Sequence, residues 1–323
     1  MKTARSISLA MCCAALALPA AQAQTYPNRP IRIIAQFTPG TSTDILARVI
    51  GGKLTESWGQ QVVVDNRPGA GGVVGTELGA KAAPDGYTLT MAVSSAFGIN
   101  PTLYTKLPYD AVKDFAPIIN IALTPQTLVS NPGFAAKSVK EFIAVAKAKP
   151  GQINFASLGS GSTSHLTMEM FRSAAGIRLN HIPYKGSPAA HGELFSGQIP
   201  IMFDAIPAVL PHIKSGRLRG LGIGSARRSP FLPDVPTIAE SGFPGFEAMG
   251  WIGIAAPART PVAILDKLHA EIVRIINTPE MKERLATLAF TPVGDTREEF
   301  ARFIKSEIAR WGKAVKESGA KAE

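Results

Sequence analysis

The sequence predicts an α/β protein of two lobes with a ligand cleft between them. Short apolar strands alternate with helices, a pattern typical of parallel-sheet α/β proteins. A strand, a turn rich in Gly, Ser and Thr, and a helix follow one another twice, once in each half of the chain. Near residues 118–130, two apolar strands adjoin with Thr124-Pro125 between them, which indicates a chain leaving one lobe for the other. We expect the C-terminal helices to return to the first lobe.

Ten segments have the apolar and β-branched character of strands. They span residues 31–37, 61–65, 88–92, 118–122, 127–130, 153–156, 181–184, 201–203, 218–223 and 250–255. Helix starts between them are marked by capping residues and by prolines suited to a first helical turn. These signals are capping boxes at Ser138 and Thr296 and the pairs Ser187-Pro188, Thr260-Pro261 and Thr278-Pro279.

The first 23 residues have the three parts of a secretory signal peptide. Lys2 and Arg5 form a basic start, and residues 7–18 form an apolar run too short to span a bilayer. Ala21-Gln22-Ala23 forms a small-residue site, so we predict cleavage after Ala23. A lipoprotein signal at Cys12 is an alternative, but Met11 is larger than the residue usually found before a lipidated cysteine.

Both cysteines, Cys12 and Cys13, lie inside this signal, so the mature chain of 300 residues has none. Disulfides, thiolate zinc sites and cysteine nucleophiles are thereby excluded. The five histidines, at positions 165, 181, 191, 212 and 269, show no metal-ligand spacing, and we expect neither a metal nor a cofactor. A mature chain of this length has ample core and is predicted to divide into two lobes.

The formal charge of +10 falls to +8 without the signal peptide. Such basicity suits nucleic acid, but the export signal argues against that partner, and the Lys and Arg residues are scattered. We expect an ordinary solvated surface. Long-range attraction of anions or a docking face for a partner is the alternative.

The first turn occupies residues 37–44 and precedes a helix from about Ile45. Backbone N–H groups and hydroxyls beside a helix start are well placed to bind an anion. An ordinary strand–helix connection with Asp44 as its cap is the alternative, although such a turn rarely needs three hydroxyl residues in succession. The candidate ligand residues here are Phe37, Thr38, Gly40, Thr41, Ser42, Thr43 and Asp44.

The second turn occupies residues 157–165 and precedes a helix from about Leu166. Its serines, threonine and glycines suggest a concave cradle of N–H and O–H donors, with a flexible surface loop as the alternative. His165 near the helix start is predicted to cap or pack rather than to bind metal. The candidate ligand residues are Ser157, Ser160, Gly161, Ser162, Thr163, Ser164 and His165.

Other candidates follow the carboxyl ends of predicted strands, the edge at which open α/β sheets bind ligands. They are Ser94, Ser95, Tyr184, Lys185 and Asp204. Asp204 is the odd member, because a carboxylate repels an anion. It is predicted to accept a ligand hydroxyl or amine, or to hold a donor of the cleft in place.

Enzyme motifs are weak or missing in this sequence. The run from Gly69 to Gly75 fails the dinucleotide pattern, because its third glycine falls on Val74, and it is predicted to form a tight turn into a helix. A secreted hydrolase built on Ser160 or Ser162 with His165 is an alternative, although no G-x-S-x-G elbow occurs. The sequence therefore gives little support to a dinucleotide-binding enzyme or to a serine hydrolase.

Short motifs along nearly the whole mature chain resemble those of a known family, the Bug-type (Bordetella uptake gene) periplasmic receptors of tripartite tricarboxylate transporters, which include TctC. The motifs are, in order, Tyr26-Pro27-Asn28-Arg29-Pro30-Ile31, Asp65-Asn66-Arg67-Pro68-Gly69-Ala70-Gly71-Gly72, Ala83-Pro84-Asp85-Gly86-Tyr87-Thr88-Leu89, Asn100-Pro101-Thr102-Leu103-Tyr104, Leu107-Pro108-Tyr109-Asp110, Lys113-Asp114-Phe115-Ala116-Pro117, Pro183-Tyr184-Lys185-Gly186-Ser187, Met202-Phe203-Asp204 and Leu232-Pro233-Asp234-Val235-Pro236-Thr237.

The resemblance implies a two-lobe, type II periplasmic-binding-protein fold that closes over a small organic acid, a mono- or dicarboxylate. Its carboxylate would be held by the two opposed turns, and membrane transporter subunits would receive it. The resemblance also implies that the protein has no enzymatic activity. We expect a monomeric periplasmic protein with residues 24–122 and 247–323 in lobe 1 and residues 123–246 in lobe 2. A sensory subunit for a membrane kinase is the alternative.

The chain departs from the family pattern in the first turn. Thr41 and Ser42 stand where relatives usually have glycines. These side chains are predicted to narrow the pocket and to add two hydroxyls, which favours a smaller or more polar ligand. Ala96-Phe97 is predicted to add an apolar wall, with a core position for Phe97 as the alternative.

Overall fold

A computed structural model describes residues 26–322 of the chain, so the predicted signal peptide lies outside the described residues. The strands are β1 (Ile31–Ala35), β2 (Val62–Asn66), β3 (Thr88–Val93), β4 (Phe115–Ser130), β5 (Asn154–Ser157), β6 (Asn180–Pro183), β7 (Ile201–Ala205), β8 (Arg219–Ile223), β9 (Met249–Pro257) and β10 (Thr291–Pro292). No helix in this described range is long and apolar enough to cross a membrane.

Helices separate these strands along the chain, as predicted. The α-helices are α1 (Ser42–Trp58), α2 (Val73–Ala80), α3 (Asn100–Leu103), α4 (Val139–Ala148), α5 (Thr163–Ala175), α6 (Ser187–Ser196), α7 (Ile206–Lys214), α8 (Val262–Ile276), α9 (Pro279–Thr287) and α10 (Arg297–Ser318). A short 3-10 helix, η1 (Ala70–Gly72), precedes α2, and a short π-helix, η2 (Ser95–Ile99), precedes α3. The glycine-rich run therefore forms the predicted tight turn into a helix.

The strands form one continuous sheet in the order β2-β1-β3-β9-β4-β7-β5-β6, with β8 and β10 paired to β4. Within each lobe the prediction of parallel pairing holds, since β1 pairs in parallel with β2 and β3, and β5 with β6 and β7. The two long strands differ, because β9 runs antiparallel to β3 and β4, and β4 runs antiparallel to β7. The sheet is therefore mixed.

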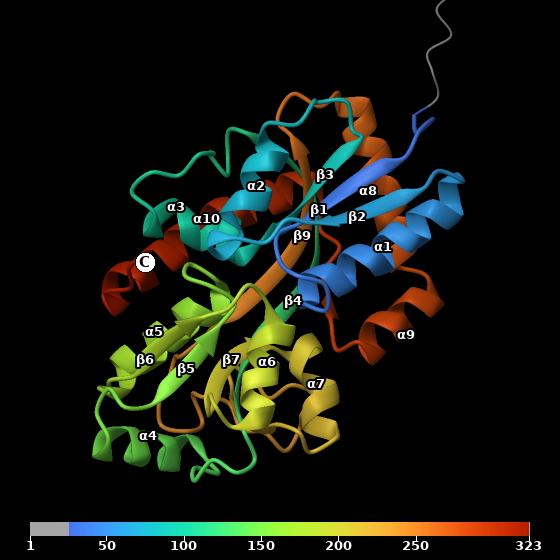
Figure 1. Ribbon diagram of the computed structural model, residues 1–323. Coiled ribbons are helices and arrows are strands. Elements are labelled where there is room, and N and C mark those ends of the chain that lie inside the picture. Colours follow the sequence, from blue (N-terminus) through green and yellow to red (C-terminus); the bar gives the residue numbers. More distant parts are fainter. Residues whose placement is uncertain (1–25, 323) are drawn as a thin grey trace, which may run out of the picture.

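The strand β4 crosses from one lobe to the other, as Figure 1 shows. The prediction of two separate strands around Thr124-Pro125 was wrong, because β4 is continuous from Phe115 to Ser130. Proline does not end the strand here because the strand changes partner at this point. Residues up to Pro125 pair with β9, and residues from Gln126 onward pair with β7. This change of partner occurs at Thr124-Pro125, the pair at which the sequence suggested that the chain leaves one lobe.

Separate hydrophobic cores hold the two lobes. In lobe 1, β1, β3 and β9 bury residues such as Ile33, Met91 and Ile254 against α1 and α8. In lobe 2, Phe171 packs against Phe203 among other fully buried side chains. A third cluster joins the lobes, because Trp311 of α10 and Leu166 of α5 share it. Figure 1 shows α10 running beside α5 at this junction.

The predicted helix starts have mixed outcomes. Thr296 forms a complete capping box with Glu299, and Thr278 caps α9, as predicted. Ser138 caps α4, but the Glu141 carboxylate accepts from the Lys137 N–H instead of closing the box.

Two predicted caps were wrong because the helices start at other residues. Gly186 precedes α6, so Ser187 lies inside that helix. Pro261 precedes α8, and the Thr260 hydroxyl donates to the Pro257 carbonyl.

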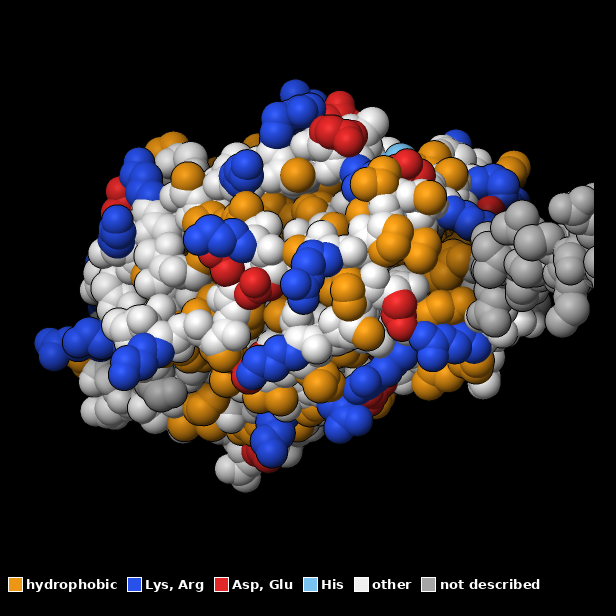
Figure 2. Space-filling model, turned by 90° about the horizontal axis from the view of Figure 1, so that it is seen from above, with side chains coloured by type: hydrophobic (Ala, Val, Ile, Leu, Met, Phe, Trp, Pro, Cys, Tyr) orange, Lys and Arg blue, Asp and Glu red, His pale blue; other side chains and the backbone are white. Residues whose placement is uncertain are grey.

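Lys and Arg side chains lie scattered over the face of the molecule in Figure 2, with Asp and Glu side chains among them. They do not gather into one basic patch on that face. On this face the charged side chains are therefore distributed as on an ordinary solvated surface.

Candidate functional site

The first turn leads from β1 into α1 and is organised by its own polar groups. Thr41 is the N-cap, and its hydroxyl accepts from the Asp44 N–H and donates to the Thr38 carbonyl. The alternative that Asp44 caps the helix is therefore wrong. Ser42 is the first residue of α1, and its buried hydroxyl has no hydrogen-bond partner. Of the two added hydroxyls, that of Thr41 stabilises the turn and that of Ser42 is free.

Asp44 holds this turn from behind. Its carboxylate accepts from the Gly40 N–H at 2.9 Å and from the Asn66 amide at 2.9 Å, and it pairs with Arg48 at 2.9 Å. The side chain is only 4% exposed. Because its oxygens are used by these groups, Asp44 fixes the backbone that presents the helix start.

The second turn leads from β5 into α5 and is held by neutral groups. Ser162 is the N-cap and accepts from the His165 N–H at 3.2 Å. The Ser164 hydroxyl accepts from the Leu158 N–H at 2.9 Å and lies 3.1 Å from the Ser162 hydroxyl. The Gly161 N–H donates to His165 Nδ1 at 3.3 Å.

His165 packs inside lobe 2, as predicted. Its ring stacks on that of His181, with centroids 4.2 Å apart, and the Phe155 ring also stacks on His181, with centroids 4.9 Å apart. Burial, with help from His181 and Arg172, lowers the pKa of His165 to about 3. The imidazole is therefore neutral near pH 7, which suits Nδ1 as an acceptor for the Gly161 N–H.

The two helix starts meet at one small cavity of about 50 Å³ between the lobes. From the first turn come Thr41, Ser42 and Thr43, and from the second come Ser162, Thr163 and Ser164. The full lining is Phe37, Thr41, Ser42, Thr43, Val93, Ser94, Ser95, Thr124, Gln126, Leu158, Ser162, Thr163, Ser164, Asp204, Ala205, Trp251 and Ile252. The two predicted turns therefore face a common space, although they belong to different lobes.

Ten of the predicted ligand residues line this cavity, and nine do not. The nine are Thr38, Gly40, Asp44, Ser157, Ser160, Gly161, His165, Tyr184 and Lys185. Most of these shape the turns. The Ser157 hydroxyl, for example, lies 2.6 Å from His181 Nε2 and accepts from the Gly159 N–H. Tyr184 and Lys185 follow β6, the strand at the edge of the sheet, and lie outside the lining.

The predicted apolar wall from Ala96-Phe97 was wrong, and the alternative core position is correct. Phe97 is fully buried and packs on Phe115, with ring centroids 4.8 Å apart. The apolar part of the lining comes instead from Phe37, which was predicted, and from residues that sequence reasoning missed, such as Trp251. Thr124 and Gln126 were also missed, because they lie on β4 and resemble ordinary strand residues.

Asp204 lines the cavity at the end of β7. Its carboxylate accepts from the Ala205 N–H at 2.8 Å and lies 3.0 Å from His191 Nε2, and both side chains are 4% exposed. His191 is not part of the lining, so it anchors Asp204 from behind the wall.

The lobes touch directly around the cavity. The hydroxyls of Ser94 and Thr163 lie 2.8 Å apart, and the Tyr104 hydroxyl lies 3.2 Å from the carbonyl oxygens of Ala70 and Ser160. Gly71 sits so close to the second turn that a Cβ atom there would lie 2.4 Å from the Ser160 carbonyl oxygen. These contacts describe a closed arrangement of the lobes.

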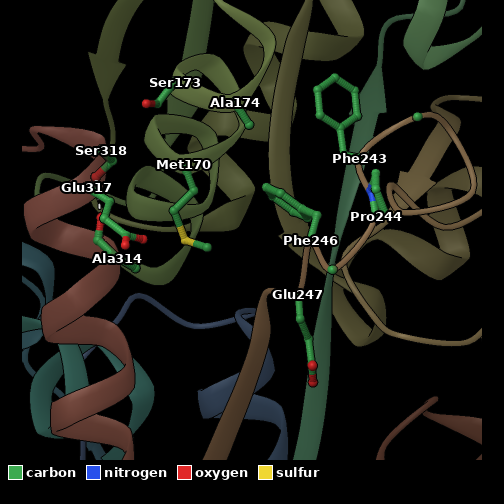
Figure 3. A pocket seen from close by; sticks show the side chains of 12 residues that line it. Met170, Ser173, Ala174, Phe243, Pro244, Phe246, Glu247, Ala314, Glu317 and Ser318 are labelled. Carbon is green, nitrogen blue, oxygen red and sulfur yellow. Dashed lines mark hydrogen bonds between the residues drawn. The ribbon is translucent and has the colours of Figure 1, made fainter.

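A larger hollow of about 490 Å³ lies elsewhere, between α5, the end of α10 and residues 242–247. Figure 3 shows Met170, Phe246, Glu247 and Glu317 around it. It contains no predicted site residue and neither of the two helix starts. In residues 26–322, no cluster of His, Cys, Asp and Glu side chains that could hold a metal is present.

Residues 46–320 match the family model described as "Tripartite tricarboxylate transporter family receptor". The chain belongs to this receptor family. Protein BugT of Bordetella pertussis is 42% identical over 316 residues, which cover 98% of this chain and 97% of BugT. The predicted resemblance is thereby confirmed, and so is its class, a periplasmic solute-binding receptor.

Solved structures of similar receptors have the same fold. The structure of R. palustris Rpa4515 with adipate has a TM-score of 0.89 at 33% identity, covering 92% of this chain and 99% of that chain. MatC from Rhodopseudomonas palustris with bound malate has a TM-score of 0.86 at 31% identity, covering 90% of this chain and 100% of that chain. These receptors confirm the predicted two-lobe, type II periplasmic-binding-protein fold with a cleft between the lobes.

Proposed function

We propose that this receptor binds a small organic anion, a mono- or dicarboxylate, in the cavity between the lobes and delivers it to the membrane components of a tripartite tricarboxylate transporter. The observation that carries the proposal is that the N-termini of α1 and α5 face the same cavity. Similar receptors have been solved with adipate and with malate.

The chemistry of the cavity suits a carboxylate held by neutral donors. Unpaired N–H groups and the positive end of the helix dipole favour an anion at each helix start. Hydrogen bonds to an ionised acceptor are roughly twice as strong as neutral ones. The hydroxyls of Ser42, Ser94 and Ser95 add donors beside the first helix start. We propose that the lining residues among the predicted set contact the ligand and that the others fix the turns.

The remaining parts of the proposal concern the lobes and the state of the protein. We propose that residues 24–122 and 247–323 move against residues 123–246, and that the contacts around Gly71 and Tyr104 form on closure. We further propose a monomer, exported with cleavage after Ala23, that binds no nucleic acid.

We also propose that the protein has no catalytic activity. The His165 ring accepts from a backbone N–H and stacks on His181, so it does not serve as a base for a serine. A hydrolase needs the imidazole and the nucleophile within hydrogen-bond reach.

A thermal-shift panel of carboxylates and amino acids, followed by calorimetry on the hits, tests the proposal. We expect a rise in melting temperature and a one-to-one binding heat with at least one carboxylate, and no turnover of ester substrates. Absence of any shift and any heat across the whole panel would contradict the carboxylate receptor. Ester turnover that is lost in Ser162→Ala would favour the hydrolase.

A further inference from the structure

The charge inside the cavity is unusual for a site that takes an anion. Its lining contains neither Lys, Arg nor His, and Asp204 is the one ionisable side chain among the described lining residues. The ligand carboxylate therefore has no cationic partner in the lining, whereas the lining does present a buried carboxylate. The lining thus combines donors at the helix starts with acceptors.

One part of the lining, around the first helix start, consists of donors. Ser42 is 7% exposed and Ser95 is 1% exposed, and neither hydroxyl has a hydrogen-bond partner. Ser42 lies in the first turn of α1, where backbone N–H groups are also free. This part of the lining matches the oxygens of a carboxylate.

Two acceptors of the lining lie where β4 meets β7. Gln126 is 4% exposed, and its side-chain oxygen has no partner. It pairs in register with Ala205, the residue after Asp204. A carboxylate offers about four lone-pair positions, and the Ala205 N–H and His191 occupy one on each oxygen of Asp204. Asp204 can therefore accept a further hydrogen bond from a ligand.

A buried acceptor without a donor is costly, and a buried carboxylate repels a second one across a short distance. A dianion with a carboxylate at each end places one of them beside Asp204. A monoanion with an O–H or N–H group at the other end satisfies Asp204 and Gln126 instead.

We propose that the ligand is a small monocarboxylate that also carries a hydroxyl or amino donor, and that Asp204 and Gln126 accept hydrogen bonds from this donor. The inference rests on the function proposed above and narrows it from mono- or dicarboxylates to one class. The hydroxyl and amino forms share this chemistry, and the experiment separates them.

Calorimetry with ligands that differ by one group tests the inference on the unmodified mature protein. The probes are propionate, lactate and alanine, the pair butyrate and 3-hydroxybutyrate, and the dianion succinate. We expect lactate or alanine to bind at least tenfold more tightly than propionate, and succinate more weakly than either. Which of lactate and alanine binds more tightly assigns the donor.

Variants connect this preference to the residues. Asp204→Asn and Gln126→Leu are each expected to reduce the ratio of affinities between the donor ligand and propionate by at least fivefold. Asp295→Asn is the matched control, because its carboxylate accepts from the Asn120 N–H far from the lining, and it should leave the ratio unchanged.

The outcomes separate the two proposals. If propionate, butyrate or succinate binds as tightly as the donor ligands, the receptor function stands and the inference about Asp204 is overturned. If Asp204→Asn and Gln126→Leu both bind but keep the wild-type ratio, the inference is also overturned. If no carboxylate of the wider panel binds, the proposed function fails first.

Discussion

The two turns that face the cavity have the same plan but are held by opposite means. Each follows a strand, and each places a hydroxyl cap, Thr41 or Ser162, at a helix start. The first turn is held by an ionic group, the buried Asp44 with Arg48. The second is held by serine hydroxyls and a neutral His165. Turns of the same plan therefore need no equivalent side chains to hold them, and the two should respond differently to charge and pH.

The largest effect is expected from removing the ionic support of the first turn. Asp44→Ala leaves the Gly40 N–H, the Asn66 amide and Arg48 without their acceptor, and we expect it to lower the free energy of unfolding by about 3 kcal/mol. Carboxylate binding should be lost with it. Urea unfolding and calorimetry provide the measurements.

Asp65→Ala is the matched control for this loss. Asp65 also pairs with arginines, Arg32 and Arg67, but it is partly exposed and lies outside the cavity lining. We expect a cost below about 1 kcal/mol and unchanged binding. Equal costs for the two variants would contradict a special role for Asp44.

The free energy of unfolding should depend on pH through His165 of the second turn, which has no counterpart in the first turn. The unfolded state binds a proton on His165 below about pH 6.5, whereas the folded state does so only near its pKa of about 3. The unfolded state therefore binds more protons in this window, and the free energy of unfolding falls as the pH falls. From pH 6.5 to 5 the contribution is about 2 kcal/mol.

The comparison of wild type with His165→Gln isolates this contribution, because other groups titrate in both proteins. Asp295, whose pKa burial raises to about 6, acts in the opposite direction and cancels in the difference. We expect the wild type to lose stability relative to the variant as the pH falls, in urea titrations at several pH values. Parallel curves would show that His165 does not titrate as described.

A substitution at the contact between the lobes should keep the two turns apart. It therefore tests whether the turns must come together to bind the ligand. Gly71→Ala places a Cβ 2.4 Å from the Ser160 carbonyl oxygen, which prevents full closure. We expect about a tenfold loss of carboxylate affinity, equivalent to about 1.4 kcal/mol. Small-angle scattering should show that ligand no longer makes the protein more compact.

Gly59→Ala is the control for Gly71→Ala. The two glycines have similar backbone angles, with φ of 65° and 59°, but nothing lies within 4 Å of a Cβ at Gly59. Both variants carry a similar backbone cost, so only Gly71→Ala should alter binding. Similar affinities for both variants would argue against closure at this contact.

The smallest effects on stability are expected from substitutions at the N-cap residues. The two turns are alike there, because each has a hydroxyl cap. Thr41→Ala and Ser162→Ala should each lower the free energy of unfolding by about 1 kcal/mol, since each removes one accepted N–H hydrogen bond. Thr41→Ser should restore most of the loss. A difference well above 1 kcal/mol between the two alanine variants would show that one hydroxyl does more than cap its helix.

The sequence predicted what depends on local backbone chemistry and missed what depends on distant pairing. The two turns were recognisable because glycine, serine and threonine lie together in each. Gln126 and Trp251 were not, because on a strand they have the pattern of core residues. Tyr184 and Lys185 were expected at the site because they follow a strand, but β6 turned out to be the edge strand. Strand order, which no local pattern contains, decides which strand ends reach the cavity.

The continuity of β4 and β9 has a consequence for how long a ligand stays bound. These strands link the lobes and also supply Thr124, Gln126 and Trp251 to the wall of the cavity. Bending them to open the protein therefore displaces groups that line the bound ligand's space. We expect the residence time of the ligand and the lifetime of the closed state to be governed by one barrier, set by the stiffness of a hydrogen-bonded strand pair.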